Sequence, residues 1–378
     1  MLIGIDTNQA NKDIKSGVEW YTYHLIENLK KISQDEKYKH IRFRLYSSRP
    51  LTGELAKLPA NFESRVLKWL PNVTWNLWTQ VRLSIELKLQ PPDIFLAPGY
   101  TLSLLHPKKS AVVIHDLGFK HFPDYYPKLI GQYYKFITWY SIKTAWQVLV
   151  PSNYTKQDII KQYDYPADRI FVTHLSYDKN LYFPVNNKDL IISTLERFNI
   201  KKPYLLFIAR LTRKKNILGV IKAFHQIKKL GKYPDLQLVL GGQKQIGWNE
   251  AEKYITKNNL DDDIKILGYV PEVDKSVLMS AAEAFLFPSF FEGFGIPVLE
   301  AMACGTPVVT ANTTSLPEVA GEAALLVNPF NIDNIAQAIE KILTDKDLSQ
   351  SLSQKGIVRV QEFSWKKTAN KTLNILIT

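Results

Sequence analysis

Short apolar runs alternate with longer amphipathic segments, and this alternation occurs twice along the chain. In the first half, apolar runs at residues 2–6 and 41–46 flank a helical pattern from Val18 to Lys31. In the second half, an apolar run at residues 204–209 precedes a helical pattern from Ile217 to Lys229. Strand, helix and strand in repeated order are typical of parallel α/β structure. We therefore expect two doubly wound, Rossmann-like parallel-sheet domains that face a central cleft.

The remaining apolar runs continue both halves. A long aromatic helix is expected from about Lys128 to Trp146, and a polar stretch at residues 184–189 separates the halves. The chain has 378 residues, which is more than one hydrophobic core usually supports. Further strands are expected at residues 93–98, 111–116, 147–151, 236–242, 264–270, 284–288, 307–311 and 324–329.

The charge of the chain is positive and concentrated in the first half. Residues 1–185 hold 24 Lys and Arg against 16 Asp and Glu, and residues 186–378 hold 24 against 20, so +8 and +4 add up to the net charge of +12. No helix-turn-helix, zinc-finger or Lys/Arg-rich run accompanies this charge, which argues against nucleic acid. The charge is compatible with an anionic membrane surface or a phosphorylated substrate.

The cysteine count and the apolar runs of the sequence bear on whether the protein binds a metal and where it is located in the cell. A single cysteine, Cys304, excludes a disulfide framework and a multi-cysteine metal site. The apolar start at residues 2–6 is too short for a signal peptide, and no apolar run has the length of a membrane-spanning helix. We therefore expect a cytoplasmic protein, with peripheral attachment to the inner face of the membrane left open.

Common nucleotide-binding motifs are missing. The first strand is followed by one glycine, Gly17, where a dinucleotide fingerprint needs three. Gly242 and Gly247 imitate the opening of a P-loop, but Trp248 stands where the phosphate-binding lysine belongs. These observations disfavour a nicotinamide cofactor and a Walker-type ATPase.

The most informative segment is FPSFFEGFGIPVLEAMACGTPVVTANTTSLPEVAGEAALLVNP, residues 287–329. A strand leads into a loop with Gly293 and Gly295, which permit positive φ and close approach of backbone amides to a ligand. Pro297 suits the first turn of a helix, whose free N–H groups up to Leu299 would present positive partial charge to a diphosphate. Glu292 lies before this helix and Glu300 lies within it, on either side of the glycine turn.

This segment resembles the donor site of retaining glycosyltransferase family 4, the group 1 glycosyl transferases, which have the GT-B fold. FIARLTRKKN at residues 207–216 resembles the element whose Arg210 and Lys215 would grip a donor diphosphate, and VVIHDL at 112–117 resembles the strand whose histidine, His115, reaches the donor sugar. The resemblance extends to HLSYDKNLYFP at 174–184 and FSWKKTANKTL at 363–373. It implies an acceptor domain over residues 1–185, on which helix 364–378 packs, and a nucleotide-sugar donor domain over residues 186–363.

The resemblance also implies the residues of the site. The implied catalytic residues are Glu292, Arg210, Lys215 and His115, and the implied substrate-binding residues are Gly17, Gly293, Phe294, Gly295, Pro297, Val298, Leu299 and Glu300. No metal ligand is implied, and no cofactor is expected besides the nucleotide-diphosphate sugar that serves as donor. The base is expected against residues 267–274 and 240–243.

The implied reaction is metal-independent, retaining transfer of a mannose-like or glucose-like hexose to an oligosaccharide or lipid-linked acceptor hydroxyl. Two alternatives remain: a nucleotide-sugar epimerase or hydrolase on the same scaffold, and a non-catalytic scaffold that binds nucleotide sugar. A last hypothesis concerns the first domain, where tryptophans alternate with basic residues and part of the set would rest on a bilayer. The set comprises Trp69, Trp75, Trp78, Trp139, Trp146, Lys68, Arg82, Lys128, Lys135 and Lys143.

Overall fold

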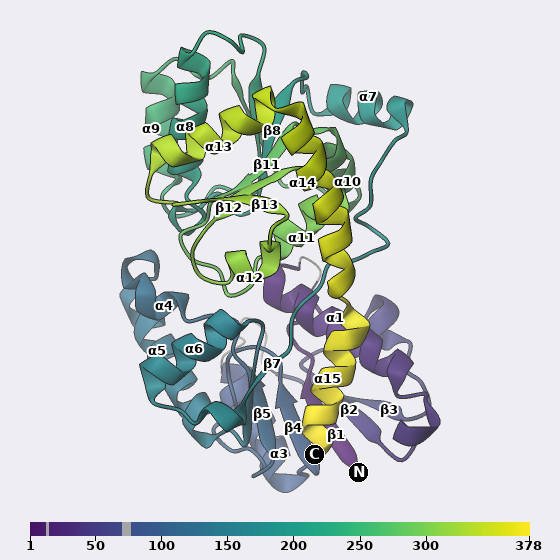
Figure 1. The fold of residues 1–378 in the computed structure, drawn as a ribbon. Helices are drawn as coiled ribbons and strands as arrows, with labels where there is room; N and C mark the ends of the chain where they lie inside the picture. Colours follow the sequence, from purple (N-terminus) through teal and green to yellow (C-terminus); the bar gives the residue numbers. More distant parts are fainter. Residues whose placement is uncertain (13–14, 70–76) are drawn as a thin grey trace. The chain divides into compact units, whose positions relative to one another are not determined.

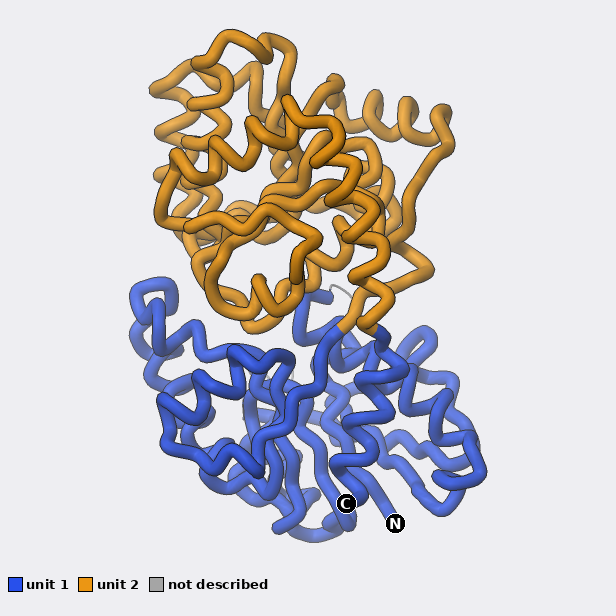
Figure 2. Tube along the Cα trace, in the orientation of Figure 1, with its two compact units in different colours: residues 1–175, 364–378 blue, residues 176–363 orange. Residues whose placement is uncertain are grey.

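The chain folds into two compact units, coloured separately in Figure 2. The structure is a computed structural model that describes residues 1–12, 15–69 and 77–378. The first unit comprises Met1–Leu175 together with Ser364–Thr378, and the second comprises Ser176–Phe363. Each unit has its own parallel sheet with helices packed on it, so the prediction of two parallel α/β domains is confirmed.

The sheet of the first unit has, within the described residues, seven parallel strands in the order β3-β2-β1-β4-β5-β6-β7. Ile3 and Ile5 of the first strand and Phe95 of the fourth are fully buried, as expected for central strands covered on both faces. The strands are β1 (Leu2–Asp6), β2 (Arg42–Ser47), β3 (Phe62–Val66), β4 (Ile94–Ala97), β5 (Ser110–Val113), β6 (Gln147–Val150) and β7 (Ile170–Val172).

The last helix of the chain belongs to the first unit. Helix α15 (Trp365–Ile377) lies beside α1 (Gly17–Ile32), as Figure 1 shows. The Trp365 ring stacks on His24 with ring centroids 5.0 Å apart, and the Tyr38 hydroxyl donates to Asn374 Oδ1 at 2.8 Å. The other helices are α3 (Ser84–Leu89), α4 (Gly118–His121), α5 (Lys128–Thr144) and α6 (Asn153–Tyr163).

The sheet of the second unit has, over the part of the chain that the structure describes, six parallel strands in the order β10-β9-β8-β11-β12-β13. Strand order reverses between the neighbouring strands β8 and β11, and such a switch point is where open α/β sheets bind ligands, beyond the carboxyl ends of the strands. The strands are β8 (Tyr204–Ile208), β9 (Gln237–Gly241), β10 (Ile264–Gly268), β11 (Ala284–Phe287), β12 (Val308–Ala311) and β13 (Ala324–Val327).

Helices cover the second sheet and fill the stretches between its strands. Helix α8 has the bounds that the sequence pattern predicts, Ile217–Lys229. The others are α7 (Lys188–Arg197), α9 (Trp248–Lys257), α10 (Glu272–Ala281), α11 (Ile296–Ala303), α12 (Leu316–Ala320), α13 (Ile332–Thr344) and α14 (Lys346–Arg359). Among the described helices, none is long and apolar enough to cross a membrane.

The division between the units falls after Leu175, earlier than the expected boundary at residue 185. The intervening residues are held by helix α10 of the second unit. The Tyr182 hydroxyl donates to Glu272 Oε2 at 2.7 Å, and the Val185 amide donates to Ser280 Oγ at 3.0 Å. These contacts place the polar stretch at residues 184–189 within the second unit rather than between the two.

Candidate active site

The loops that follow β8 and β11 meet at the carboxyl edge of the second sheet, because these strands are parallel neighbours. Lys215 in the first loop forms an ion pair with Glu292 in the second. The side chain of Lys215 is 21% exposed and that of Glu292 10%. Burial lowers the pKa of Lys215, and the Glu292 carboxylate opposes that shift. The predicted pair of catalytic groups is thus brought together in a largely desolvated place.

Lys215 is held by its neighbours in the chain. It ends the 3₁₀ turn η6 (Arg213–Lys215), which the Thr212 side chain caps by accepting from the Lys215 amide at 3.4 Å. The next residue, Asn216, has a φ of 58° and donates from Nδ2 to the carbonyl oxygens of Pro288 at 3.1 Å and Pro329 at 2.7 Å. Asn216 therefore ties the lysine turn to the loops after β11 and β13.

Gly219 makes room for that side chain. A Cβ at Gly219 would lie 2.3 Å from Asn216 Oδ1, so any larger residue would displace the asparagine. No motif or spacing in the sequence pointed to a role for Asn216 or Gly219. The signal available was the left-handed preference of asparagine directly before a helix.

Arg210 is exposed and lies two residues beyond the end of β8. Its backbone is fixed by the loop after β9, whose Gly242 has a φ of 137° and approaches Ala209 so closely that a Cβ would lie 1.8 Å from the Ala209 carbonyl oxygen. Gly247 has a φ of 93°, and its Cβ would lie 2.6 Å from that of Arg213. The two glycines that imitate a P-loop therefore serve close packing between the loops after β8 and β9.

Glu292 is held by two hydroxyl side chains that the sequence analysis missed. The Glu292 amide donates to Thr314 Oγ1 at 3.3 Å, and the Ser315 hydroxyl donates to the carbonyl oxygens of Glu292 at 2.9 Å and Phe294 at 2.8 Å. Thr314 itself has a φ of 59°. The turn after β12 thus braces the loop that runs from Glu292 through Gly293 and Phe294.

Helix α11 begins where the glycine loop ends. Gly295 caps it with a φ of 111°, and a Cβ there would lie 2.6 Å from Leu316 Cδ2, so glycine is required. Pro297 lies in the first turn, as predicted. The expectation of a free amide at Val298 is wrong, because this amide donates to the Gly295 carbonyl oxygen at 3.0 Å. The side chains of Val298 and Leu299 are fully buried and serve packing.

Glu300 lies on α11, facing helix α10 and the residues that precede α7. Burial raises the pKa of its carboxyl group to about 7, and Lys275 opposes the shift. The negative charge of Glu272 raises the pKa of Glu300 in the same direction as burial does.

The segments expected to contact the nucleotide base, residues 240–243 and 267–274, are in contact with each other. The Gly242 amide donates to the Gly268 carbonyl oxygen at 2.6 Å.

His115 belongs to the first unit and follows β5. Its side chain is buried between the rings of Tyr21 and Tyr100, with centroid distances of 4.8 and 5.4 Å. Burial lowers its pKa, so the ring is neutral near pH 7. Nε2 lies 2.8 Å from the Pro98 carbonyl oxygen, which only accepts, so Nε2 carries the proton and Nδ1 is the acceptor nitrogen.

Gly17, also in the first unit, is the first residue of α1. A Cβ at this position would meet no atom within 4 Å, so nothing in the described surroundings requires glycine there. Glu19 completes the capping box with Ser16 at the start of α1, and Glu27 pairs with Lys30 at 2.7 Å.

The tryptophans of the first unit differ in exposure. Trp78 is in the core, with Nε1 donating to the Leu67 carbonyl oxygen at 2.9 Å. Trp139 is 48% exposed on α5. Trp75 lies outside the described residues. The set proposed from sequence therefore divides into core and surface members.

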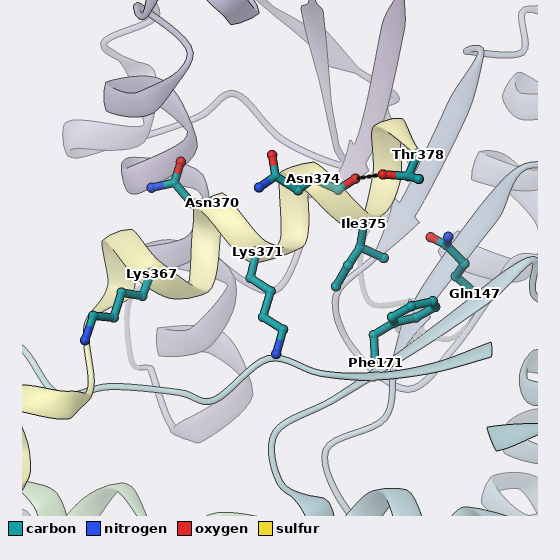
Figure 3. Close-up of a pocket in the computed structure, with 8 residues that line it drawn as sticks. All are labelled: Gln147, Phe171, Lys367, Asn370, Lys371, Asn374, Ile375 and Thr378. Atoms are coloured by element: carbon teal, nitrogen blue, oxygen red, sulfur yellow. Dashed lines mark hydrogen bonds between the residues drawn. The ribbon is translucent and has the colours of Figure 1, made fainter. Parts of the chain in front are cut away.

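A cavity of about 520 Å³ opens beside α15 in the first unit (Figure 3). It is bordered by the strand residues Gln147 and Phe171 and by one side of α15, including Lys367 and Lys371. None of the residues that the sequence predicts for the site borders it. The cavity is therefore separate from the candidate site.

Comparison with known proteins gives a consistent result. Residues 15–180 match the family model described as Glycosyltransferase Family 4, and residues 189–359 match the model described as Glycosyl transferases group 1. The O-antigen chain mannosyltransferase B of Escherichia coli is 33% identical over 272 residues, covering 71% of this chain and 70% of that protein.

Two solved structures share the fold over nearly the whole chain. Sucrose-phosphate synthase from Thermosynechococcus elongatus has a TM-score of 0.76 at 19% identity, covering 99% of this chain and 97% of that one. Anabaena Alr3699/HepE, solved in complex with UDP-glucose, has a TM-score of 0.75 at 18% identity, covering 99% of both chains. The predicted family and fold are thus confirmed. The chain belongs to glycosyltransferase family 4, with the group 1 glycosyl transferase domain in its second unit, and is a glycosyltransferase of the GT-B fold.

Proposed function

We propose that this glycosyltransferase moves mannose, or a glucose-like hexose, from a nucleoside diphosphate to a hydroxyl group of a growing glycan. The anomeric configuration is retained and no metal ion takes part. The mannosyl preference is supported by the relative named an O-antigen chain mannosyltransferase, and the nucleotide-sugar donor by the UDP-glucose bound in the Anabaena structure.

The observation that carries the proposal is the buried ion pair of Lys215 and Glu292 at the switch point of the second sheet. When a sugar leaves its diphosphate, negative charge grows on the phosphate oxygens and positive charge grows on the sugar ring. Preorganised charges of both signs stabilise such a transition state more than the ground state. Lys215 and Arg210 would stabilise the phosphate oxygens, and Glu292 would favour the positive ring and bind its hydroxyl groups.

Retention follows from attack on the face of the ring that the diphosphate leaves. The bond between the anomeric carbon and the phosphate oxygen breaks, and its electron pair stays on that oxygen. The acceptor oxygen bonds to the anomeric carbon, and its proton passes to the departing phosphate oxygen. In this scheme neither Glu292 nor Glu300 acts as a nucleophile.

The remaining predicted residues have binding roles. Glu300 would accept hydrogen bonds from the ribose hydroxyl groups, and His115 would accept one from a sugar hydroxyl through Nδ1. The amides of the Gly293–Gly295 loop would contact the phosphates. We further propose a cytoplasmic setting at a membrane surface, where a lipid-linked glycan would be presented as acceptor.

A donor screen tests this function. Purified protein is incubated with guanosine- and uridine-diphosphate sugars, with and without an oligosaccharide or lipid-linked acceptor, and the release of nucleoside diphosphate is measured. Release that depends on the acceptor, with an α-linked product by NMR from an α-linked donor, is the expected result. Release or sugar interconversion without acceptor would instead establish the epimerase or hydrolase alternative. Binding without turnover would establish the scaffold.

Metal independence is tested in the same assay. Turnover should be unchanged by EDTA. Complete loss of activity that magnesium or manganese restores would contradict the metal-free scheme.

A further inference from the structure

The first unit exposes a row of apolar side chains on consecutive helical turns. Leu77 directly precedes the π-helical turn η3 (Trp78–Leu83), and Val81, Ile85 and Leu89 follow it at intervals of four residues on η3 and α3. Side chains at this spacing lie on one side of a helix. All four are exposed, and Leu89 reaches 74%. The row is therefore directed to solvent, while Trp78, Leu83 and Leu87 of the same segment are in the core.

Helix α5 exposes a second apolar row, mixed with lysines. Its core side carries Ile137 and Ile142, yet Leu129 is 82% exposed, Phe136 55% and Trp139 48%. The 17 residues of α5 include three lysines and no aspartate or glutamate. Lys128 and Lys135 lie at exposed positions of this helix. The solvent side of α5 is thus both apolar and positively charged.

A short loop joins the two rows into one surface. The Leu104 amide donates to Gln80 Oε1 of η3 at 3.0 Å, and the Leu104 carbonyl oxygen accepts from the Tyr140 hydroxyl of α5 at 2.7 Å. Leu104 and Leu105 are themselves exposed. We call the combined surface the apolar face; it comprises Leu77, Val81, Ile85, Leu89, Leu104, Leu105, Leu129, Phe136 and Trp139.

Single exposed apolar side chains are ordinary, but a continuous set on neighbouring elements marks a surface that contacts something apolar. The positive charge around this face indicates what kind of partner it contacts. The lysines of α5 are not offset by acidic residues of the same helix, and on α3 the carboxylate of Glu86 is buried and paired with Arg65 and Arg82. Apolar and aromatic side chains flanked by lysines match the interface of an anionic bilayer.

We propose that the apolar face docks this protein on an anionic lipid bilayer. Phe136 and Trp139 enter the headgroup region, and the lysines of α5 contact anionic headgroups. This gives the membrane setting of the proposed function a specific surface, and its biological purpose rests on that function. The docking itself requires neither a sugar donor nor turnover.

Vesicle flotation of the full chain tests the proposal. The protein is mixed with vesicles of phosphatidylcholine alone or with phosphatidylglycerol added, and the bound fraction is measured. We expect binding to the anionic vesicles that weakens as salt is raised. The double substitution Phe136→Ser and Trp139→Ser should lower the partition coefficient by about ten-fold or more, because two large apolar groups are removed from the lipid contact. Lys128→Gln with Lys135→Gln should mainly reduce the preference for anionic lipid.

Matched controls lie on the second unit. Ile192→Ser with Val358→Ser removes two apolar side chains of similar exposure, 54% and 65%, and should leave binding unchanged. All variants should keep the thermal unfolding midpoint of the parent, since the altered side chains are exposed. Equal flotation of the parent and the Phe136/Trp139 variant would overturn the proposal. So would a concentration-dependent dimer in light scattering that this variant abolishes, since the face would then bind a second copy.

The same variants separate docking from catalysis. Transfer to a water-soluble acceptor should not change in the Phe136/Trp139 variant. An inactive parent that still floats would contradict the proposed function only, and an active parent that does not float would contradict only the docking.

Discussion

The Lys215 ammonium group contacts the Glu292 carboxylate across 77 positions of sequence. The pair joins the loops after two parallel strands, and each partner is positioned by polar residues of its own surroundings: Thr212 and Asn216 for the lysine, Thr314 and Ser315 for the glutamate. Opposite charges are therefore fixed in place before any ligand binds, which is the condition for electrostatic catalysis.

Replacing either cationic side chain, Lys215 or Arg210, should reduce turnover far more than it reduces the free energy of unfolding. We expect Lys215→Ala, and separately Arg210→Ala, to lower kcat by ~10² or more, the scale for removing one preorganised stabilising group. Steady-state kinetics with the preferred donor measures this. Lys222→Ala on α8 is the control, because Lys222 is outside the candidate site and contacts the Tyr254 ring. Near-normal turnover in the Lys215 and Arg210 variants would dismiss their proposed roles at the diphosphate.

Asn216→Ala should destabilise the second unit. The substitution leaves the carbonyl oxygens of Pro288 and Pro329 without their donor in a buried place, which costs about 1–3 kcal/mol per unsatisfied group. Chemical denaturation measures the loss. The control is Asn370→Ala, which removes a side chain that donates to the Lys366 carbonyl oxygen one helical turn earlier in an exposed hydrogen bond; it should change the free energy of unfolding by less than about 0.5 kcal/mol. Equal effects of the two substitutions would contradict the bridging role of Asn216.

Two glycine substitutions should differ in their effect on stability. Gly242→Ala places a Cβ 1.8 Å from the Ala209 carbonyl oxygen at a φ of 137°, so we expect loss of stability and displacement of Arg210. Gly17→Ala adds a Cβ in open space at a helical position and should be neutral or stabilise by up to about 1 kcal/mol. Thermal unfolding and turnover are compared for both. Loss of activity in a stable Gly17→Ala variant would support the phosphate role implied by the family resemblance.

Donor binding should depend on pH through Glu300. Burial raises the pKa of this carboxyl group from 4.5 to about 7, and the ionised form is the better acceptor for ribose hydroxyl groups. The KM for the donor should therefore fall as pH rises from about 6 to 8. In Glu300→Gln, which cannot ionise, the KM should be higher and its dependence over this range should flatten. An unchanged pH profile in that variant would exclude Glu300 as the titrating group.

The same shift gives a stability effect of defined sign. Because the folded pKa is above the ordinary value, the folded state binds the proton more tightly than the unfolded chain. The contribution of Glu300 to the free energy of unfolding is therefore complete below about pH 4.5 and is lost as pH rises through about 7. Denaturation of the parent and of Glu300→Gln across this range measures it.

The buried parts of the fold could be predicted from the sequence because their pattern is continuous. Strand β8 and helix α8 followed directly from an apolar run and a helical period. The edge strands β3 and β7 were missed. In β3 the middle residues Glu63, Ser64 and Arg65 are exposed, and β7 has only three residues, so neither has the apolar run of a central strand.

The charged residues of the site could be proposed from the sequence, but their supports could not. Lys215 and Glu292 stood out through the family resemblance. Asn216, Thr314 and Ser315 lie in turns, where polar residues are expected for many reasons and no periodicity singles out one of them. Gly242 was set aside as part of a false P-loop, because its role depends on a backbone contact between loops that only the folded sheet creates.

The placement of α15 affects the order in which the polypeptide matures on the ribosome. All of the second unit, residues 176–363, lies between the two segments of the first. In the first unit, α1 therefore lacks the helix that packs against it until residues 365–377 have been made. By then all residues of the second unit have been made. A chain released after residue 363 should accordingly hold a finished second unit and an unfinished first one, with the Tyr21 and His24 side of α1 still uncovered.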